Sequence, residues 1–286
     1  MSPLLIAITT CLTLIILTII YMNIETRFLK ISKHTFNHKT GSTASKLTFI
    51  HFTDLHLGRT GIKTEKLTNT IFQNESDFLV FTGDYFERES EIPKLIQLMD
   101  EIRSNYTKPI YLCFGNHDNG DVFSKAPGTK EHVCTELEKR NITILENTSA
   151  TYHTEDTKKQ LRIIGLTDAR SNKENIPDII DKHCSTDPHI PNLLITHNSD
   201  LLMKMKSASV DFAVAGHTHG AQVRTPFNIE TKLLHKKDFL SSTQNIIRGY
   251  HRYNNIDLYI SRGIGCSMLP IRFISKPEIV IYNIIF

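Results

Sequence analysis

Apolar residues are distributed unevenly along this chain. One long apolar run extends from Pro3 to Met22, and the first 24 residues contain no charged side chain. A helix needs about twenty apolar residues to cross the hydrocarbon layer of a membrane, so this run predicts a transmembrane anchor over residues 3–22. A secretory signal peptide would need a positively charged start, a shorter apolar stretch and a small-residue cleavage site, and none of these is present. A cleaved or exported form and a buried core helix are the remaining alternatives.

A polar segment follows the anchor, and a series of short apolar runs follows that segment. Residues 23–46 lack periodicity and predict a juxtamembrane tether. The short runs are rich in Phe, Ile and Val and each ends in polar residues, which is typical of strands buried on both faces. They occupy residues 47–54, 78–84, 109–118, 192–198 and 210–219, and two closing strands are expected at 256–261 and 279–286.

Helical patterns lie between these runs. In residues 92–106 the apolar positions fall on one stripe of a helix, and residues 130–140 and 200–206 are shorter candidates. Strands that alternate with helices predict an α/β domain over residues 47–286.

Composition and charge narrow the classes of function. With 40% hydrophobic and 22% charged residues, the chain is not a disordered protein. Residues 1–46 hold five Lys/Arg and one acid, whereas the remainder is nearly neutral, so no nucleic-acid partner is expected. All the basic residues near the span follow it, which predicts a single-pass protein of the inner (cytoplasmic) membrane with its domain in the cytoplasm. Five scattered cysteines without a Cys-x-x-Cys spacing indicate neither a disulfide framework nor a cysteine metal site.

Polar side chains of a particular kind follow five of the predicted strands. Taken singly, a His in an apolar run is usually a core residue and an Asp after a strand usually caps a turn. Five such ends in succession instead indicate a site, because ligands of open α/β sheets bind outside the carboxyl ends of the strands. Imidazole and carboxylate together suit Mn²⁺, Zn²⁺ or Fe²⁺, and seven ligands suit two divalent metal ions that share a carboxylate. The candidate metal ligands are Asp54, His56, Asp84, Asn116, His197, His217 and His219.

These motifs, in this order and spacing, resemble the calcineurin-like metallophosphoesterase superfamily. The segments TDLHLG (53–58), AGHTHGAQV (215–223) and SRGIGCSMLPIRF (261–273) are similar to its bacterial membrane-anchored branch, which includes phosphodiesterases and UDP-diacylglucosamine pyrophosphatases. Ser199 stands where the branch usually has Pro, and Ala221 where it often has Gly; neither change removes a ligand. The resemblance implies a four-layer αββα sandwich of two packed mixed β-sheets.

The resemblance also implies roles for the site residues. Asp84 would bridge two metals, and a hydroxide between the metals would attack the phosphorus. His117 would be catalytic rather than a ligand, donating to the phosphate or to the leaving oxygen, with Asp118 accepting from its other ring nitrogen. Arg59 is a candidate phosphate clamp or, alternatively, an exposed loop charge. The implied ligand sets are Asp54, His56, Asp84 and His219 for the first metal, and Asp84, Asn116, His197 and His217 for the second.

The expected function is therefore hydrolysis of a phosphodiester or pyrophosphate bond at a membrane. A lipid-linked substrate such as UDP-diacylglucosamine is the first hypothesis. Residues 226–253 mix basic and apolar side chains that could contact lipid headgroups and acyl chains, or they form a plain surface excursion. The alternatives are a phosphodiesterase that acts on a soluble substrate and a membrane scaffold that has lost catalysis.

Overall fold

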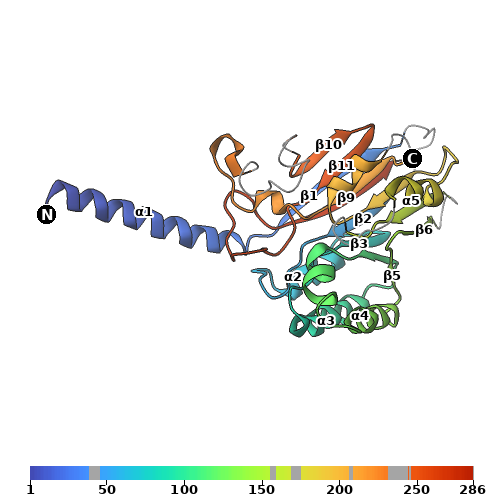
Figure 1. Cartoon of the computed structure of the whole chain (residues 1–286), viewed down its shortest axis with the longest axis horizontal. Coiled ribbons are helices and arrows are strands. Elements are labelled where there is room, and N and C mark those ends of the chain that lie inside the picture. Colours follow the sequence, from blue (N-terminus) through green and yellow to red (C-terminus); the bar gives the residue numbers. More distant parts are fainter. Residues whose placement is uncertain are drawn as a thin grey trace.

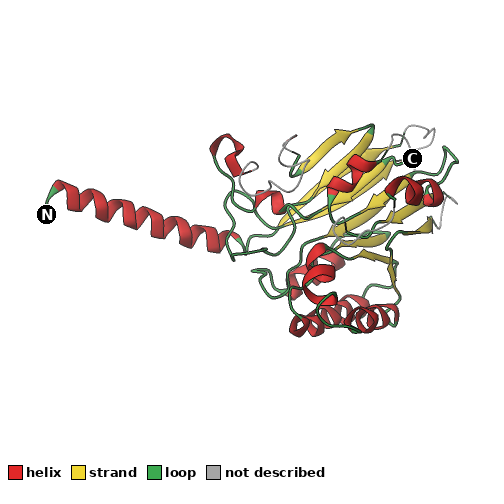
Figure 2. Cartoon of the chain, in the orientation of Figure 1, coloured by secondary structure: helices red, strands yellow, loops and turns green. Residues whose placement is uncertain are grey.

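Two six-stranded mixed sheets pack face to face and carry helices on their outer surfaces (Figures 1 and 2). The computed structural model describes residues 1–38, 46–154, 159–168, 175–205, 209–230, 244 and 246–285. The first sheet has the order β1-β12-β2-β3-β4-β5 and the second has the order β10-β11-β9-β8-β7-β6. The strands of the first sheet are β1 (Lys30–Asn37), β2 (Lys46–Phe52), β3 (Phe78–Thr82), β4 (Ile110–Cys113), β5 (Ile142–Ile144) and β12 (Glu278–Ile285). Those of the second are β6 (Thr148–His153), β7 (Gln160–Gly165), β8 (Asn192–Ile195), β9 (Phe212–Ala215), β10 (Gly249–Tyr253) and β11 (Ile256–Ile260).

Three hydrophobic layers hold the four-layer sandwich together. The central layer fills the space between the sheets with side chains such as Phe49, Phe78, Val214 and Tyr282. The outer layers join the first sheet to α2 (Thr64–Phe72), α3 (Ile92–Arg103) and α4 (Thr129–Glu138), and the second sheet to α5 (Ile176–His183). Because both faces of β3, β4, β8 and β9 are covered, their side chains are buried throughout, and the predicted αββα fold is confirmed.

The expected helices correspond to observed ones with one exception. α3 begins with a proline in its first turn, where the missing N–H costs nothing, and buries Leu95, Met99 and Ile102 against the first sheet. The expected helix over residues 200–206 is instead a 3₁₀ turn, η3 (Ser199–Lys204). Residue 206 of the expected helix lies outside the described residues. The side chain of Asn198 accepts from the Asp200 N–H and caps this turn.

The amino-terminal helix α1 (Pro3–Glu25) projects away from the sandwich (Figure 1). Its length and composition would let it cross a membrane, and its apolar side chains are exposed along the projecting part. Threonines within it do not disturb the helix, since the hydroxyls of Thr9, Thr13 and Thr18 donate to carbonyl oxygens four residues earlier.

The tether expected between the helix and the domain is wrong for residues 30–37. These residues form β1, which pairs in parallel with β12 from Lys30 opposite Glu278 to Asn37 opposite Ile285. Polar residues dominate β1 because it is an edge strand, and Phe36 is its one fully buried side chain. Only a few residues therefore separate α1 from the first sheet. Residues 39–45 of the expected tether lie outside the described residues.

Candidate metal centre

Loops from both sheets converge at the carboxyl ends of their parallel strands. β2, β3 and β4 are neighbours in the first sheet, and β8 and β9 are neighbours in the second. The seven side chains predicted as ligands follow these five strands. The structure brings them together as two groups that share one edge of the sandwich.

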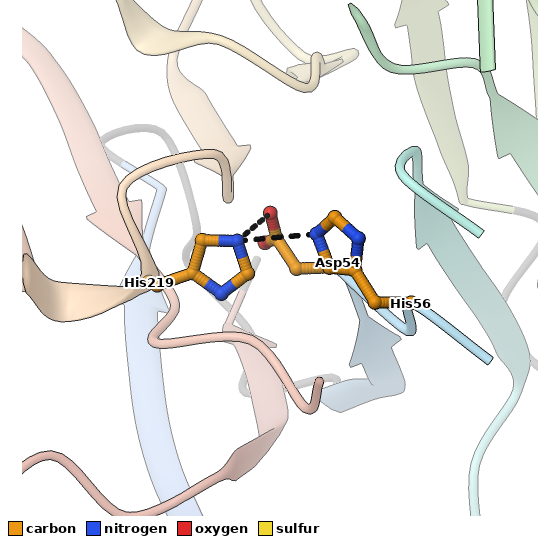
Figure 3. A group of neighbouring side chains, drawn as sticks. All are labelled: Asp54, His56 and His219. Carbon is orange, nitrogen blue, oxygen red and sulfur yellow. Dashed lines mark hydrogen bonds and ion pairs between the residues drawn. The ribbon is translucent and has the colours of Figure 1, made fainter. Parts of the chain in front are cut away.

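The first group contains Asp54, His56 and His219 (Figure 3). The Nε2 atoms of His56 and His219 lie 3.2 Å apart, and Nε2 of His219 lies 3.4 Å from Oδ1 of Asp54. All three side chains are buried.

The second group contains Asp84, Asn116, His197 and His217 around one nitrogen atom. Nε2 of His197 lies 3.1 Å from Oδ2 of Asp84, 3.1 Å from Oδ1 of Asn116 and 3.1 Å from Nδ1 of His217. The same Oδ2 of Asp84 is 3.8 Å from Nε2 of His56 in the first group. Asp84 therefore stands between the two groups, as a bridging carboxylate would.

The donor atoms of the two groups fit divalent cations. Nδ1 of His197 lies 2.9 Å from the Thr82 carbonyl oxygen, and Nδ1 of His56 lies 3.2 Å from Oε1 of Glu87. The hydrogen bond with the Thr82 carbonyl fixes the imidazole tautomer of His197 and turns the lone pair of its Nε2 inward. Inward-facing nitrogen lone pairs next to carboxylate oxygens repel one another unless a proton or a cation lies between them.

Backbone strain occurs at most of the candidate ligands. Asp54, His56, Asp84, His217 and His219 all have positive φ angles, between 40° and 72°. The left-handed conformation costs about 1 kcal/mol or more for a residue with a Cβ atom. Five of the seven candidate ligands accept this cost, which is the pattern expected where function dictates the backbone.

Two glycines make room for the carboxylates. A Cβ atom on Gly115 would lie 2.2 Å from Oδ1 of Asp84, and one on Gly216 would lie 2.3 Å from Oδ2 of Asp54. Any other residue would displace the carboxylates. Steric exclusion therefore explains why the Gly-Asn-His-Asp and Gly-His-Thr-His motifs begin with glycine.

The protonation states of Asp84 and His197 depend on each other. Burial opposes ionisation of Asp84, but His197 outweighs it and holds the pKa of Asp84 well below its ordinary value. Burial also disfavours the cationic form of His197, yet the Asp84 carboxylate raises the pKa of His197 to about 10. Burial, His56 and Arg272 together lower the pKa of His219 well below its ordinary value, so His219 is neutral and able to bind a metal.

His117 lies beside the first group but is not part of it. Its ring is 5.2 Å from the ring of His56, and its backbone N–H donates to Oδ1 of Asp84 at 2.9 Å. Nδ1 of His117 lies 2.5 Å from Oδ2 of Asp121, one turn further along the π-helical turn η2 (Asp118–Phe123). Hydrogen bonds from His117 and Lys125 outweigh the partial burial of Asp121 and lower the pKa of Asp121.

The expected contact between Asp118 and the His117 ring is wrong. The Asp118 carboxylate accepts hydrogen bonds from the backbone N–H groups of Asp84, Tyr85 and Gly115 at 2.8 to 2.9 Å. It therefore holds the loop of Asp84 in place from below the site. A residue four positions after His117, rather than the adjacent one, reaches the ring because both lie on the same helical face.

Arg59 is held by protein groups. Its guanidinium contacts the Glu87 carboxylate at 2.5 Å and also donates to the Ser267 carbonyl oxygen. One third of the side chain is exposed. The contacts indicate that Arg59 supports Glu87, which itself faces His56.

Sequence reasoning missed three residues of this region. Glu87 contacts His56, Asp121 contacts His117, and Arg272 is a fully buried arginine whose Nη2 lies 3.5 Å from Nδ1 of His219. The signal for Asp121 was its i+4 spacing from His117. Arg272 belongs to the segment 261–273 that carries the family resemblance, but the sequence assigned it no role.

A cleft of about 580 Å³ opens over the two groups. Asp84, Asn116, His117, His217 and His219 line its polar side. The apolar part of its lining is formed mainly by Val223, Met268, Leu269 and Ile271. The site therefore offers polar chemistry and an apolar surface within one cleft.

Comparison with known proteins agrees with this geometry. The family model described as calcineurin-like phosphoesterase matches residues 47–221, which is more than half of the chain. The uncharacterized metallophosphoesterase YkoQ of Bacillus subtilis is 27% identical over 92% of this chain and 93% of its own length. The UDP-2,3-diacylglucosamine pyrophosphatase LpxG of Chlamydia trachomatis is 25% identical over 98% and 97%. The phosphodiesterase YaeI of Escherichia coli is 23% identical over 85% and 83%. With the fold and the paired ligand groups, the family match shows that the chain belongs to the calcineurin-like phosphoesterase family, whose members hydrolyse phosphoesters.

Proposed function

We propose that this protein is a membrane-anchored phosphoesterase that uses two divalent cations to hydrolyse a phosphodiester or pyrophosphate bond. The observation that carries the proposal is the position of Asp84 between two groups of inward-facing ligands, at the base of an open cleft. Asp54, His56, Asp84 and His219 would hold one cation, and Asp84, Asn116, His197 and His217 the other. Mn²⁺, Zn²⁺ and Fe²⁺ all suit such imidazole and carboxylate donors.

The residues around the cations have separate tasks. When bound, the two cations neutralise the phosphoryl oxygens and activate the attacking water. His117 donates a hydrogen bond to the phosphoryl group or a proton to the leaving oxygen, because its ring lines the cleft next to the ligands. Asp121 positions that ring, and Asp118 keeps the loop of Asp84 fixed.

The apolar wall of the cleft favours a lipid-linked substrate. Met268, Leu269 and Ile271 would contact acyl chains while the phosphate lies at the polar side. The similarity to LpxG supports UDP-diacylglucosamine as a first choice. We infer that the domain lies on the cytoplasmic face of the inner membrane, because the basic residues Arg27, Lys30 and Lys33 follow the span.

A substrate panel tests the function. Full-length protein in detergent is loaded with Mn²⁺ and incubated with UDP-diacylglucosamine, UDP-glucose and a chromogenic phosphodiester. The proposal expects hydrolysis of the lipid substrate to be the fastest, and Asp84→Asn to remove it. Hydrolysis of the two water-soluble substrates alone would make the protein a phosphodiesterase of soluble compounds. No turnover of any of the three, with cations bound, would indicate a scaffold.

A further inference from the structure

The last residue of α1 is bonded to a loop that follows the site. Glu25 is buried, and its carboxylate accepts hydrogen bonds from the backbone N–H groups of Ile274 at 3.0 Å and Ser275 at 2.8 Å. A carboxylate with two backbone donors forms a strong contact, because its charge strengthens both bonds. The end of the helix is therefore fixed to this loop.

Neighbouring residues of the helix reinforce the contact. The Arg272 N–H donates to the carbonyl oxygen of Met22 at 2.9 Å, and the Asn23 side chain donates to the Pro270 carbonyl at 3.0 Å. The ring of Phe273 meets the ring of Tyr21 edge-on at 5.9 Å. Figure 1 shows the carboxyl-terminal part of the chain reaching the base of the projecting helix.

These contacts set the level of the membrane relative to the domain. A helix rises 1.5 Å per residue, so a span of about 30 Å that starts at Pro3 ends close to Met22. The loop residues bonded to Met22, Asn23 and Glu25 would then lie at the boundary between hydrocarbon and headgroups.

Four apolar side chains are exposed at this level. They form what we call the apolar rim: Phe28, Met268, Leu269 and Ile274, with exposed fractions of 53%, 81%, 59% and 56%. Met268 and Leu269 also line the cleft above the ligand groups. Apolar side chains gathered at one edge of a soluble surface are costly, whereas at a membrane interface the same side chains are stabilised.

Basic residues accompany the apolar rim. Arg27 directly precedes Phe28, and the Lys276 ammonium lies 5.9 Å from the centre of the Phe28 ring. Each Lys or Arg close to an anionic lipid surface contributes about 1 kcal/mol to membrane association. Apolar side chains with cations beside them match the interface of a bilayer that contains anionic lipids.

We propose that the apolar rim lies in the membrane interface and that the cleft opens directly on to the bilayer. An amphiphilic phosphoester would then enter the cleft without leaving the lipid layer. Met268 and Leu269 would provide the apolar path from the acyl chains to the ligand groups. This inference rests on the proposed anchor and deepens the proposed function by naming the surface from which the substrate comes.

The absence of tryptophan from the chain allows a direct test. Leu269→Trp places a single fluorophore in the apolar rim of the full-length protein. Phe72→Trp is the matched control, because Phe72 is also an exposed apolar side chain but lines a hollow at the amino ends of β3 and β4, away from the site. Tyr21→Trp reports the span itself. Each variant is reconstituted into vesicles of phosphatidylethanolamine and phosphatidylglycerol, with or without lipids brominated near the headgroup end of the acyl chain.

The proposal expects brominated lipid to reduce the emission of Leu269→Trp about twofold or more, since interfacial side chains enter the outer 5–10 Å of the lipid layer. Emission of Phe72→Trp should not change. Quenching of Tyr21→Trp without quenching of Leu269→Trp would overturn the apolar rim and leave the anchor intact. Quenching of neither would overturn both, and equal quenching of Phe72→Trp would show unspecific adsorption and refute the proposed orientation. Because fluorescence needs no substrate, these outcomes are separate from a failure of the hydrolase assay.

Discussion

Asp121 provides a sharp test of how His117 is positioned. Nδ1 of His117 lies 2.5 Å from Oδ2 of Asp121, and Asp121 also contacts the Lys125 ammonium at 3.2 Å. Asp121→Ala removes the hydrogen-bond acceptor while leaving His117 and the candidate metal ligands in place. The ring of His117 then becomes free to rotate, and a smaller fraction of molecules presents Nε2 to the leaving oxygen.

The size of the effect follows from exposure. A hydrogen bond that involves charged groups contributes about 1.5–3 kcal/mol when buried. The Asp121 side chain is 43% exposed, so solvent screening reduces this to about 1 kcal/mol, the upper range for surface ion pairs. Asp121→Ala should therefore lower kcat roughly fivefold. His117→Ala removes the donor itself and should lower kcat by about 10² to 10⁴ with the metal content unchanged.

Single and double variants separate positioning from other roles. The rates of Asp121→Ala, His117→Ala and the double variant are measured on phosphoesters with good and poor leaving groups. Once His117 is absent, the loss of Asp121 should have no further effect, and Lys125→Ala should resemble the unmodified protein. A further fivefold loss in the double variant would refute the account, because Asp121 would then act independently of the imidazole.

Three more predictions concern the helix contact, the protons of the site and the topology. Glu25→Ala should lower the free energy of unfolding by about 2 kcal/mol, because it leaves the buried backbone donor of Ser275 and the partly buried one of Ile274 without their acceptor, while the exposed Glu75→Ala should have no effect; thermal unfolding measures both. Cation binding must displace the proton that Asp84 stabilises on His197, so apparent affinity should rise about tenfold per pH unit for each proton released between pH 6 and 8, and a pH-independent affinity in metal titrations would contradict this. A cysteine introduced by Glu131→Cys should react with an impermeant maleimide only after sealed spheroplasts are opened, and labelling from outside would reverse the proposed orientation.

The sequence predicted the strands that precede the candidate ligands for a physical reason, although β1, β5, β6, β7 and β10 were not expected. Strands covered on both faces appear as short apolar runs, and parallel strands bring the residues that follow them to one edge. Knowing the runs was therefore sufficient to expect Asp54 and Asp84 at one edge of a sheet, whereas His197 reaches them because the second sheet packs against the first. Their side-chain contacts were not needed for that inference.

The sequence could not predict contacts between distant segments. β1 looked like a tether because an edge strand with one buried side chain, Phe36, has no apolar pattern. Asp118 was expected to accept from the His117 ring, whereas the π-helical turn directs Asp121 to the ring. The contact of Glu25 with residues 274 and 275 joins the two ends of the chain, and no local pattern encodes it.

The structure describes residues 226–253 only in part. Residues 231–243 and 245 lie outside the described residues. Within the described part, β10 forms an antiparallel pair with β11, and Phe227 is almost fully exposed. Its expected role in contacting lipid headgroups stays a prediction.

The central claim is that Asp84 joins two cation sites, and metal content tests it most directly. Full-length protein and the Asp84→Asn variant are reconstituted with Mn²⁺, passed through a desalting column, and analysed by plasma mass spectrometry. The account predicts two ions per chain in the unmodified protein and a loss at both sites in the variant, since a neutral amide cannot offset the repulsion between two cations. One ion or none in the unmodified protein, or two ions retained by Asp84→Asn, would contradict it.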